Sequence, residues 1–424
     1  MNTRHEAIDP VRIGFVGVGG MGTHHIKNLV RMAGARIVAL CDIREAHAAR
    51  AGEIVEQAGQ PAPTLYTRGE TDFERLCAEE ELDLVYTATP WEWHTRVSVA
   101  AMENGKHAAT EVPAAVTLEE CWQLVETAEK TGRYCFMAEN CCYDRTEMLI
   151  LNMVRQGALG ELLHAECGYL HDLRSLLFER DGEALWRLAH VEVRNGDLYP
   201  THGLGPVAQW MDINRGNRFA RLVSMGTQSL GLNLYAEQHF GAESAQARRS
   251  YAQSDIVTTL IQTELNQTIM IKHDTVSPRP YSRGILAQGT RGIVRKYPEE
   301  LIHLEGRTTG DVWEPLETYQ AEFEHPLWKQ TLESLTDVGG HGNMDYLVDY
   351  RLLQCLRAGV EPDIDVYDAA AWSAVSALSA QSLAGGSRPV EFPDFTRGRW
   401  RARAPLGIIG AGASGTEEES TAVW

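Results

Sequence analysis

A glycine-rich turn between a short apolar segment and a helix-forming segment constrains this chain more than any other feature. Residues 11–16 are apolar apart from Arg12 and rich in β-branched side chains, as in a strand that is buried on both faces. The segment after them reads Gly17-Val-Gly19-Gly20-Met21-Gly22. A helix is expected over 23–32. Glycines at this spacing allow a tight turn and let the backbone approach a pyrophosphate, to which the helix N-terminus offers free amides. The pattern predicts a dinucleotide-binding Rossmann domain.

An acidic residue follows the second expected strand. This strand is expected over 36–41, which is apolar after Arg36, and Asp42 comes next, twenty positions after Gly22. A carboxylate at this place accepts hydrogen bonds from ribose hydroxyls and repels a 2′-phosphate. The sequence therefore favours NAD over NADP as the cofactor.

Strands and helices continue to alternate up to about residue 143. Strands are expected over 82–89, 107–110 and 134–138, with helices over 93–103 and 117–131. This rhythm is typical of a parallel doubly wound sheet, in which ligands bind beyond the carboxyl ends of the strands. The segments expected at those ends are Gly17 to Gly22, Asp42, Thr89 to His94, Glu111 to Pro113, and Glu139-Asn140. We expect them to converge on one crevice.

The rhythm changes in the second half. A helix is expected over 144–156, and strands without a helix after each are expected over 160–172, 222–228, 254–263, 268–274 and 285–296. Helices resume over 343–358 and 366–384. This is typical of an open, largely antiparallel sheet with one covered face. The predicted fold class is α/β, with an NAD-binding Rossmann domain over 1–143, a substrate-binding and oligomerisation domain over 144–400, and a tail over 401–424.

Composition excludes several classes of function. The chain has 39 Lys and Arg against 58 Asp and Glu, a net charge of −19, which argues against nucleic acid as a partner. We find no apolar run of the ~18 residues that a membrane span needs and no apolar core of a signal peptide near the N-terminus. The cysteines lack zinc-site spacing, and Cys141-Cys142 are interpreted as small buried residues. We expect a cytoplasmic protein with no metal.

Two loops carry a resemblance to a known family. They are Ala88-Thr89-Pro90-Trp91-Glu92-Trp93-His94 and Glu111-Val112-Pro113. Together with the Rossmann turn, they resemble the glucose–fructose oxidoreductase, inositol dehydrogenase and MocA (Gfo/Idh/MocA) oxidoreductase family. That family usually carries Lys in the middle of the second loop, where its ammonium helps to deprotonate a substrate hydroxyl. This chain has Val112 there.

That departure and four further motifs resemble one branch of the family. They are Glu139-Asn140-Cys141-Cys142-Tyr143, Tyr199-Pro200-Thr201-His202, Gly339 to Asp345, and Pro393 to Trp400. Together they are similar to glycoside hydrolase family 109, the NAD-dependent α-N-acetylgalactosaminidases. The resemblance covers nearly the whole chain except the tail.

The resemblance implies a redox-neutral glycosidase. In it, NAD+ oxidises the sugar C3 hydroxyl, a base removes the acidified C2 proton, the C1 aglycone leaves by elimination, water adds, and the hydride returns. NAD is then tightly bound and recycled in each turnover. The implied cofactor contacts are Met21, Gly22, Asp42, Trp91, Trp93, His94, Glu111, Val112 and Asn140. The implied sugar contacts are Tyr169, Arg187, Tyr199, Pro200, Thr201, His202 and Tyr281, with Glu139 in the same site.

The residues leave alternative roles open for the two catalytic candidates. A His titrates near neutrality, so His202 suits the general base at the C3 hydroxyl, or it caps the following helix. We place His202 in a loop that Pro200 rigidifies. Tyr169 is expected on the sheet face toward the cleft, where it is the base at C2, a hydrogen-bond partner of the sugar, or a core residue.

The binding candidates have alternatives as well. Arg187 anchors a sugar oxygen or an acetamide carbonyl, or forms a surface salt bridge. Tyr199 and Tyr281 are packing residues or form the walls of the ligand site, because aromatic rings suit sugar faces. Glu139 is the partner of a substrate hydroxyl, or it holds Asn140 and a helix terminus.

Three classes of function remain in competition at this point. A redox-neutral glycosidase is favoured over a net NAD-dependent sugar dehydrogenase by Val112, and over a non-catalytic dinucleotide sensor by the convergence of Tyr, His and Arg residues. The glycone is N-acetylgalactosamine, another hexose or an anionic sugar such as sulfoquinovose, in the α or the β anomer. The expected partners are a small glycoside and further copies of the chain, which pair through the open face of the second sheet.

Overall fold

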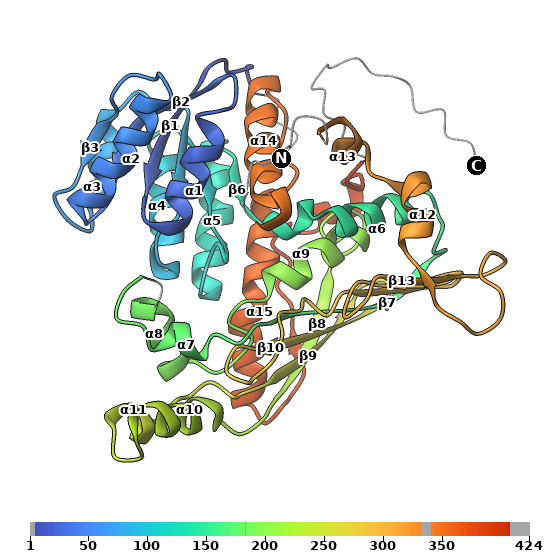
Figure 1. Cartoon of the computed structure of the whole chain (residues 1–424). Coiled ribbons are helices and arrows are strands. Elements are labelled where there is room, and N and C mark those ends of the chain that lie inside the picture. Colours follow the sequence, from blue (N-terminus) through green and yellow to red (C-terminus); the bar gives the residue numbers. More distant parts are fainter. Residues whose placement is uncertain (1–4, 183, 332–340, 408–424) are drawn as a thin grey trace.

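The computed structural model describes residues 5–182, 184–331 and 341–407 (Figure 1). The first half contains a sheet of six parallel strands in the order β3-β2-β1-β4-β5-β6. Its strands are β1 (Val11–Val16), β2 (Ala35–Cys41), β3 (Thr64–Tyr66), β4 (Leu84–Thr87), β5 (His107–Thr110) and β6 (Cys135–Met137). This order is that of a dinucleotide-binding doubly wound sheet. The predicted Rossmann architecture is confirmed.

Helices connect these strands. They are α1 (Gly20–Leu29), α2 (Glu45–Gln57), α3 (Asp72–Glu79), α4 (Trp91–Glu103) and α5 (Leu118–Thr131). α1 begins inside the glycine turn, earlier than predicted. α5 begins with a capping box in which Thr117 and Glu120 satisfy each other's backbone amides. The elements between 45 and 79 were not among those predicted.

The second half contains a sheet of nine strands in the order β14-β13-β12-β11-β7-β10-β9-β8-β15. Its strands are β7 (Leu162–Leu170), β8 (Phe219–Gly226), β9 (Val257–Thr263), β10 (Thr268–Asp274), β11 (Leu286–Gly289), β12 (Gly292–Arg295), β13 (Leu301–Leu304), β14 (Glu314–Pro315) and β15 (Val390–Glu391). Only β7 and β10 pair in parallel. The largely antiparallel sheet is as predicted, but the strand expected over 285–296 is a hairpin of two strands.

The second half also has more helices than predicted. They are α6 (Arg145–Arg155), α7 (Arg174–Leu177), α8 (Ala184–Val193), α9 (Thr201–Trp210), α10 (Gly231–Phe240), α11 (Ala245–Arg248), α12 (Glu317–Phe323), α13 (Pro326–Thr331), α14 (Met344–Ala358) and α15 (Val366–Ala384), with the short 3₁₀ segments η1 (Asn140–Tyr143), η2 (His341–Asn343) and η3 (Arg399–Ala402). The unpredicted helices α7 to α13 are short, and α9 contains Gly203, Gly205 and Pro206, which disfavour a helix. Packing against β7 stabilises α9. The two elements lie so close that a Cβ at Gly203 would be 2.4 Å from the backbone nitrogen of Gly168, so only glycine fits there.

Two helices of the second half pack against the first half. α14 contacts α1 and β1, while α15 contacts α5 and β6 as well as β8 of the second sheet. Figure 1 shows α15 reaching from the Rossmann half to the second sheet, while α14 lies beside α1. Most of α15 is buried, as expected of a helix with apolar residues on every side. The C-terminal helices therefore join the two halves into one body.

One face of the second sheet lies against helices α6, α9 and α15 (Figure 1). On the other face, Met270, Leu260 and Val223 are register neighbours across three strands. Leu260 is 47% exposed, and Met225 nearby is 66% exposed. Within the described ranges, this face presents apolar side chains to the surroundings.

The end of the chain is ordered further than predicted. Residues 401 and 402 belong to η3, and Arg403 forms an ion pair with Asp365 at the start of α15. The predicted tail therefore begins too early, and 408–424 lie outside the described residues.

All eight cysteines are buried and free. Among the described residues, none of the helices combines the length and the apolar character needed to cross a membrane.

Candidate active site

A cavity of about 470 Å³ lies beyond the carboxyl ends of the parallel strands. This is where doubly wound sheets bind their ligands. Its lining includes predicted cofactor residues from four loops, namely Gly17, Gly19, Gly20, Met21, Asp42, Thr89, Trp91, Trp93, His94, Glu111 and Val112. From the second half it includes Trp186, Arg187 and Tyr199. The cavity thus joins the predicted cofactor site to part of the predicted sugar site.

The glycine turn has the geometry that a dinucleotide requires. Gly17 has φ +81°, and a Cβ there would lie 2.7 Å from the carbonyl oxygen of Ala88. A Cβ at Gly22 would lie 2.0 Å from the carbonyl oxygen of Gly17, so this glycine packs the helix onto the turn. At Gly20 a Cβ would meet open space, and α1 begins there. The start of α1 therefore offers free amides to a pyrophosphate next to the cavity.

Asp42 fixes the shape of the turn and also lines the cavity. Its Oδ2 accepts a hydrogen bond from the backbone of Val18 at 2.9 Å, and its Oδ1 accepts one from Arg44 at 2.8 Å. The carboxylate is therefore held rigidly at the edge of the cavity. Each oxygen has a second lone pair for a ribose hydroxyl.

His94 braces two loops of the cavity wall. Its Nδ1 lies 2.7 Å from the carbonyl oxygen of Pro113, and its Nε2 lies 2.7 Å from that of Thr89. Burial lowers the pKa of His94, although both carbonyl oxygens act in the opposite direction. We assign His94 the role of holding the loops, because both ring nitrogens face backbone carbonyls.

Glu111 is held by a histidine that sequence reasoning did not connect with it. Its Oε1 lies 2.6 Å from Nε2 of His25 in α1, and the other ring nitrogen of His25 lies 2.8 Å from Asp349 of α14. Burial alone would lower the pKa of His25, but the two carboxylates outweigh it and raise the pKa well above its ordinary value. His25 is therefore a buried imidazolium that fixes Glu111 at the cavity.

Asn140 is not among the residues that line the cavity. Its Nδ2 donates a hydrogen bond to Oδ1 of Asp345 at 2.5 Å. Oδ2 of Asp345 lies 3.1 Å from Nε2 of His24 and 2.8 Å from Nδ1 of His341. Asp345 thus holds the amide nitrogen of Asn140, and a cofactor contact of this residue stays a prediction. The adjacent histidines of α1 thus each meet one acidic residue of α14.

Aromatic rings line the end of the cavity that belongs to the second half. The Tyr199 ring stacks on Trp91 with centroids 5.5 Å apart, and it lies 4.6 Å from Tyr169 and 4.8 Å from His202. The Arg187 guanidinium lies 5.2 Å from the centre of the Trp91 ring and 5.1 Å from that of Tyr199. Burial raises the pKa of Tyr199 well above its ordinary value, so its phenol stays neutral.

Glu139 and His202 form a carboxylate–imidazole pair next to these rings. Oε1 of Glu139 lies 2.8 Å from Nδ1 of His202 and accepts a bond from the Cys141 amide. Burial opposes ionisation of Glu139, but His202 outweighs it and lowers the pKa of the carboxyl. When Nδ1 donates to this carboxylate, the neutral imidazole keeps Nε2 as its acceptor. The pair has the form of a general base and its orienting group.

One prediction for this segment needs correction. His202 is the second residue of α9 rather than part of a loop, because Pro200 precedes the helix as its N-cap residue. Thr201 and Glu139 are fully buried, and Glu139 caps the start of η1, which agrees with the second of the two roles left open for it.

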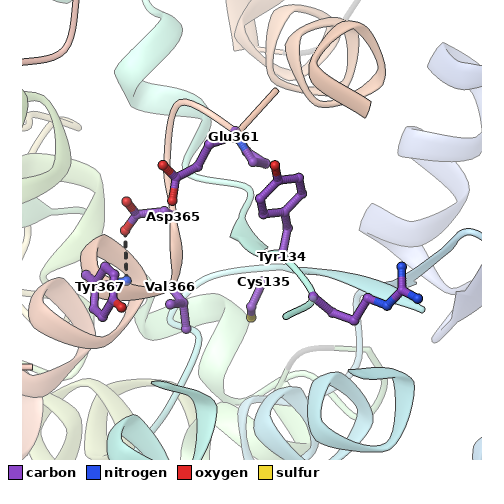
Figure 2. Close-up of a pocket in the computed structure, with 8 residues that line it drawn as sticks. Tyr134, Cys135, Glu361, Asp365, Val366 and Tyr367 are labelled. Atoms are coloured by element: carbon purple, nitrogen blue, oxygen red, sulfur yellow. Dashed lines mark hydrogen bonds between the residues drawn. The ribbon is translucent and has the colours of Figure 1, made fainter. Parts of the chain in front are cut away.

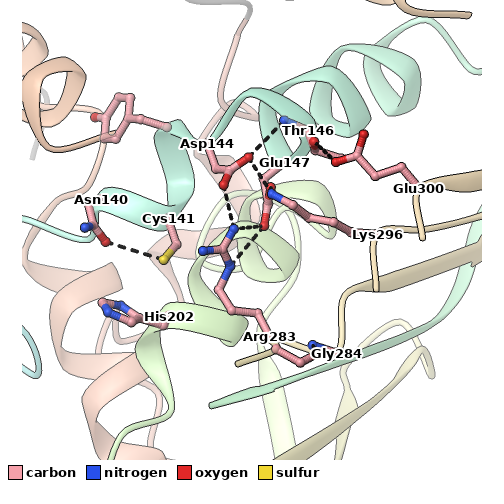
Figure 3. A network of polar contacts seen from close by, with 12 residues as sticks. Asn140, Cys141, Asp144, Thr146, Glu147, His202, Arg283, Gly284, Lys296 and Glu300 are labelled. Atoms are coloured by element: carbon pink, nitrogen blue, oxygen red, sulfur yellow. Dashed lines mark hydrogen bonds and ion pairs between the residues drawn. The ribbon is translucent and has the colours of Figure 1, made fainter. Parts of the chain in front are cut away.

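Tyr281 is anchored through its neighbour Arg283, which is part of a buried charge network. Figure 3 shows Arg283 and Lys296 facing the acidic residues Asp144 and Glu147 at the start of α6. Burial opposes ionisation of Asp144, but Lys296 and Arg283 outweigh it and lower its pKa. Arg283 also lies 3.4 Å from the Tyr281 hydroxyl. The network fixes the segment that carries Tyr281, whose ring centroid lies 6.3 Å from that of Tyr169.

Glu139, Cys141 and His202 also lie close enough together to be considered as metal ligands. One potential ligand atom from each lies within 4.8 Å of the others. Burial raises the pKa of the Cys141 thiol well above its ordinary value, which opposes the thiolate that a metal needs. One oxygen of Glu139 is already hydrogen-bonded to His202 and to the amide of Cys141. We assign no metal role to these residues.

A second hollow lies between β6 and the start of α15, far smaller than the first. Figure 2 shows Tyr134 and Cys135 on one side and Glu361 and Asp365 on the other. Its volume is about 10 Å³, which is room for about one water molecule. It has no room for a substrate.

The fold and the cavity together define a Rossmann-type NAD-binding enzyme with a second domain built on an open sheet. A family model described as "Oxidoreductase family, NAD-binding Rossmann fold" matches residues 11–139. A second, described as "Glycosyl hydrolase 109, C-terminal domain", matches residues 143–402. The chain belongs to glycosyl hydrolase family 109, and NAD is its cofactor.

Two curated relatives carry the same family description. A glycosyl hydrolase family 109 protein of Solibacter usitatus is 47% identical over 398 residues, which cover 93% of this chain and 90% of the relative. One from Saccharopolyspora erythraea is 46% identical over 406 residues, covering 96% and 87%. The chain is therefore an enzyme, an NAD-dependent glycosidase or sugar oxidoreductase.

Solved structures with low sequence identity share the fold. A levoglucosan dehydrogenase in complex with NADH and L-sorbose is 18% identical, with a TM-score of 0.71 over 91% of this chain and 100% of that one. An inositol dehydrogenase homologue from Azotobacter vinelandii in complex with NAD+ is 21% identical, with a TM-score of 0.65 over 91% and 98%. Both are similar to this chain across the two halves of the molecule.

Proposed function

We propose that this protein is a redox-neutral glycoside hydrolase that acts on α-N-acetylgalactosaminides or closely related hexosides. The observation that supports this most is the buried Glu139–His202 pair beside a cavity whose other end holds the dinucleotide turn. A base next to a nicotinamide site suits the oxidation of a sugar hydroxyl. Bound NAD+ supplies a hydride acceptor for the sugar and gives the hydride back before product leaves.

His202 is the proposed base at the C3 hydroxyl. Nε2 takes the hydroxyl proton, while Glu139 stabilises the imidazolium that forms and keeps the ring in place. The carboxylate is fully buried, so water competes little for it. When the hydride returns, His202 gives the proton back to the C3 oxygen.

Tyr169 is the proposed base at C2. Its ring lies 5.6 Å from that of His202, so the two side chains can address neighbouring carbons of one ring. A carbonyl at C3 acidifies the C2–H bond. Removal of the C2 proton lets the C2–H electron pair form a C1=C2 bond as the aglycone leaves with the C1–O electrons. Water then adds at C1, and a proton returns to C2.

Arg187, Tyr199 and Tyr281 are the proposed sugar-binding residues. The Arg187 guanidinium is held over three aromatic rings and can donate to a carbonyl oxygen such as that of an acetamide group. Tyr281 is 40% exposed and forms the outer wall. An N-acetyl substituent fits this donor, which supports N-acetylgalactosamine as the glycone.

Further copies of the chain are the proposed protein partners. The row of Met270, Leu260 and Val223 on the face of the second sheet turned away from α9 and α15 is the proposed contact. Pairing of this face in a symmetric dimer would bury its apolar side chains.

Hydrolysis in deuterated water tests the mechanism. Elimination places deuterium at C2 of the released sugar, whereas a displacement by two carboxylates leaves C2–H intact and a net dehydrogenase releases ketone and NADH. NMR and mass spectrometry of the product separate these three results.

A panel of nitrophenyl glycosides, with and without added NAD+, identifies the glycone. Protein as purified is expected to carry NAD, and full activity without any nucleotide would contradict the mechanism.

A further inference from the structure

His171 is a histidine beside the sugar site that the proposed chemistry has not used so far. It directly follows β7, which ends at Leu170. Leu170 exchanges two backbone hydrogen bonds with Ser282, and the amide of His171 donates to the carbonyl oxygen of Asp274 at 2.8 Å. The ring therefore stands on backbone that is fixed from both sides.

The His171 ring lies between two proposed sugar-site tyrosines. Nδ1 of His171 lies 3.1 Å from the hydroxyl of Tyr169, which is two positions earlier on the same side of the strand. The ring also meets the Tyr281 ring edge to face at 5.0 Å. These contacts direct Nδ1 toward Tyr169.

The surroundings of His171 keep its imidazole neutral. The charged and titratable groups near it are Arg187 of α8, His202 of α9, His341 and the adjacent Asp172. Burial lowers the pKa of His171, and Arg187 lowers it further. The Asp172 carboxylate acts in the opposite direction, but Arg174 neutralises it with bonds of 2.9 and 2.7 Å. A neutral ring can accept the Tyr169 proton at Nδ1.

A tyrosine needs such an acceptor if it is to act as a base near neutral pH. Its phenol has an ordinary pKa of about 10, so most of it is protonated. A phenol whose proton passes to an imidazole can take up another proton without first becoming a free phenolate. The 3.1 Å contact supplies this acceptor.

We propose that His171 is the proton acceptor behind Tyr169 in the C2 step, which rests on the function proposed above. As the C2–H bond breaks, its electrons move into the C2–C3 bond and the C3 carbonyl becomes an enolate. The phenol oxygen takes the C2 proton and passes its own proton to Nδ1 of His171. The aglycone leaves with the C1–O electrons and takes a proton from water, which leaves hydroxide.

The proton then returns by the same route. Hydroxide adds at C1, Tyr169 delivers a proton to C2, and the His171 imidazolium restores the phenol. No oxidant or reductant is needed for these steps. His171 acts only through Tyr169, so it is a positioning residue and not one that touches the sugar.

Exchange at C2 isolates this step from the others. The probe is a 3-keto-1,5-anhydrohexitol with an acetamido group at C2. This compound has no leaving group at C1, and it is incubated with the NADH-loaded enzyme in deuterated buffer. NMR then follows the loss of C2–H. We expect His171→Ala and Tyr169→Phe each to slow exchange by about 10²-fold or more, and the double variant to be no slower than Tyr169→Phe.

Two further variants separate chemistry from structure. His171→Asn keeps a side-chain carbonyl as a hydrogen-bond acceptor but not a base, so its exchange is expected to stay slow, and free imidazole is expected to speed exchange by His171→Ala. His239→Asn makes the same change at an exposed histidine of α10 outside the cavity lining, and is expected to change exchange by less than about 3-fold, well below the contribution of an acid–base group.

The hydride step provides the control for folding. With an intact glycoside in a single turnover, absorbance at 340 nm is expected to rise at a similar rate in wild type and in His171→Ala. Unchanged C2 exchange in His171→Ala would overturn the proposal, and so would an equal loss of both steps. If the wild type forms NADH but never exchanges C2–H, the elimination mechanism itself fails, and the inference about His171 fails with it.

Discussion

The carboxylate of Glu139 holds the imidazole of His202 from behind, with Oε1 2.8 Å from Nδ1 and no exposed surface on the Glu139 side chain. The two residues come from different halves of the molecule, since Glu139 follows β6 and His202 lies in α9. The end of the Rossmann sheet thus orients the residue that is proposed to act on the sugar. One hydrogen bond thus links the two halves of the molecule at the proposed base.

Replacing Glu139 by Gln is expected to lower kcat by about 10²–10⁴-fold, the range of general acid–base catalysis. An amide can present its NH₂ group to Nδ1, which favours the wrong tautomer and cannot stabilise an imidazolium. Steady-state kinetics with a nitrophenyl glycoside measures this, with NAD content by extraction as the control. A rise in KM at unchanged kcat would show that Glu139 affects only binding.

Replacing His202 by Ala is expected to lower kcat by a similar factor of about 10²–10⁴. Because the two residues act as one unit, the double variant with Glu139→Gln is expected to be no slower than His202→Ala alone. If the kcat losses of the two single variants multiplied in the double variant, Glu139 and His202 would act independently. Circular dichroism and bound NAD check that each variant folds.

Replacing Asp42 by Ala is expected to weaken NAD binding by about 1–2 kcal/mol, because hydrogen bonds to the ribose are lost. NADP+ binding is expected to improve, because a carboxylate that repels a 2′-phosphate is removed. Titration calorimetry on protein stripped of nucleotide measures both. Glu45→Ala removes the same charge from an exposed neighbour outside the cavity lining and is the matched control. An unchanged preference would contradict the role of Asp42.

The cofactor half of the site could be predicted because its signals are local. The spacing from Gly17 to Gly22 and the place of Asp42 after a strand depend on short stretches of sequence, and the structure puts these residues around one cavity. The same reasoning put His24 and His25 on the first helix. It had no means to find that their partners are Asp345 and Asp349, over 300 positions away.

The second half was harder to predict for physical reasons. α9 contains glycines that disfavour a helix but let it lie against Gly168 of β7 and against Glu139. Such packing is decided by residues distant in the sequence, so no local pattern reveals it. The role of His171 depends likewise on its contacts with Tyr169 and Tyr281, of which only the first is near in sequence.

The oligomeric state is a further prediction. Light scattering is expected to give a mass that is a multiple of 47.1 kDa. Leu260→Asp is expected to shift the protein toward the monomer, because it places a charge in the apolar row of the uncovered sheet face. Leu234→Asp on α10, where the side chain is 60% exposed, is the matched control. A monomeric wild type would contradict the proposed pairing.

The buried imidazolium of His25 predicts a loss of stability at alkaline pH. Its pKa is raised above the unfolded value because Asp349 and Glu111 outweigh the effect of burial. The stabilisation is therefore fully present below about pH 6.5, the ordinary His pKa, and is lost as the pH rises through the folded value. Deprotonation leaves two carboxylates without their cation.

Replacing Asp349 by Asn is expected to lower the free energy of unfolding by about 3–5 kcal/mol at pH 6, as for removal of one partner of a buried ion pair. The deficit relative to wild type is expected to shrink as the pH rises, since the wild type loses the same interaction. Urea unfolding between pH 6 and 10 measures this, with partly exposed His164→Gln as the control. A deficit that stays constant across this range would mean that His25 is neutral in the folded protein, and Glu111 would then be held by an uncharged hydrogen bond.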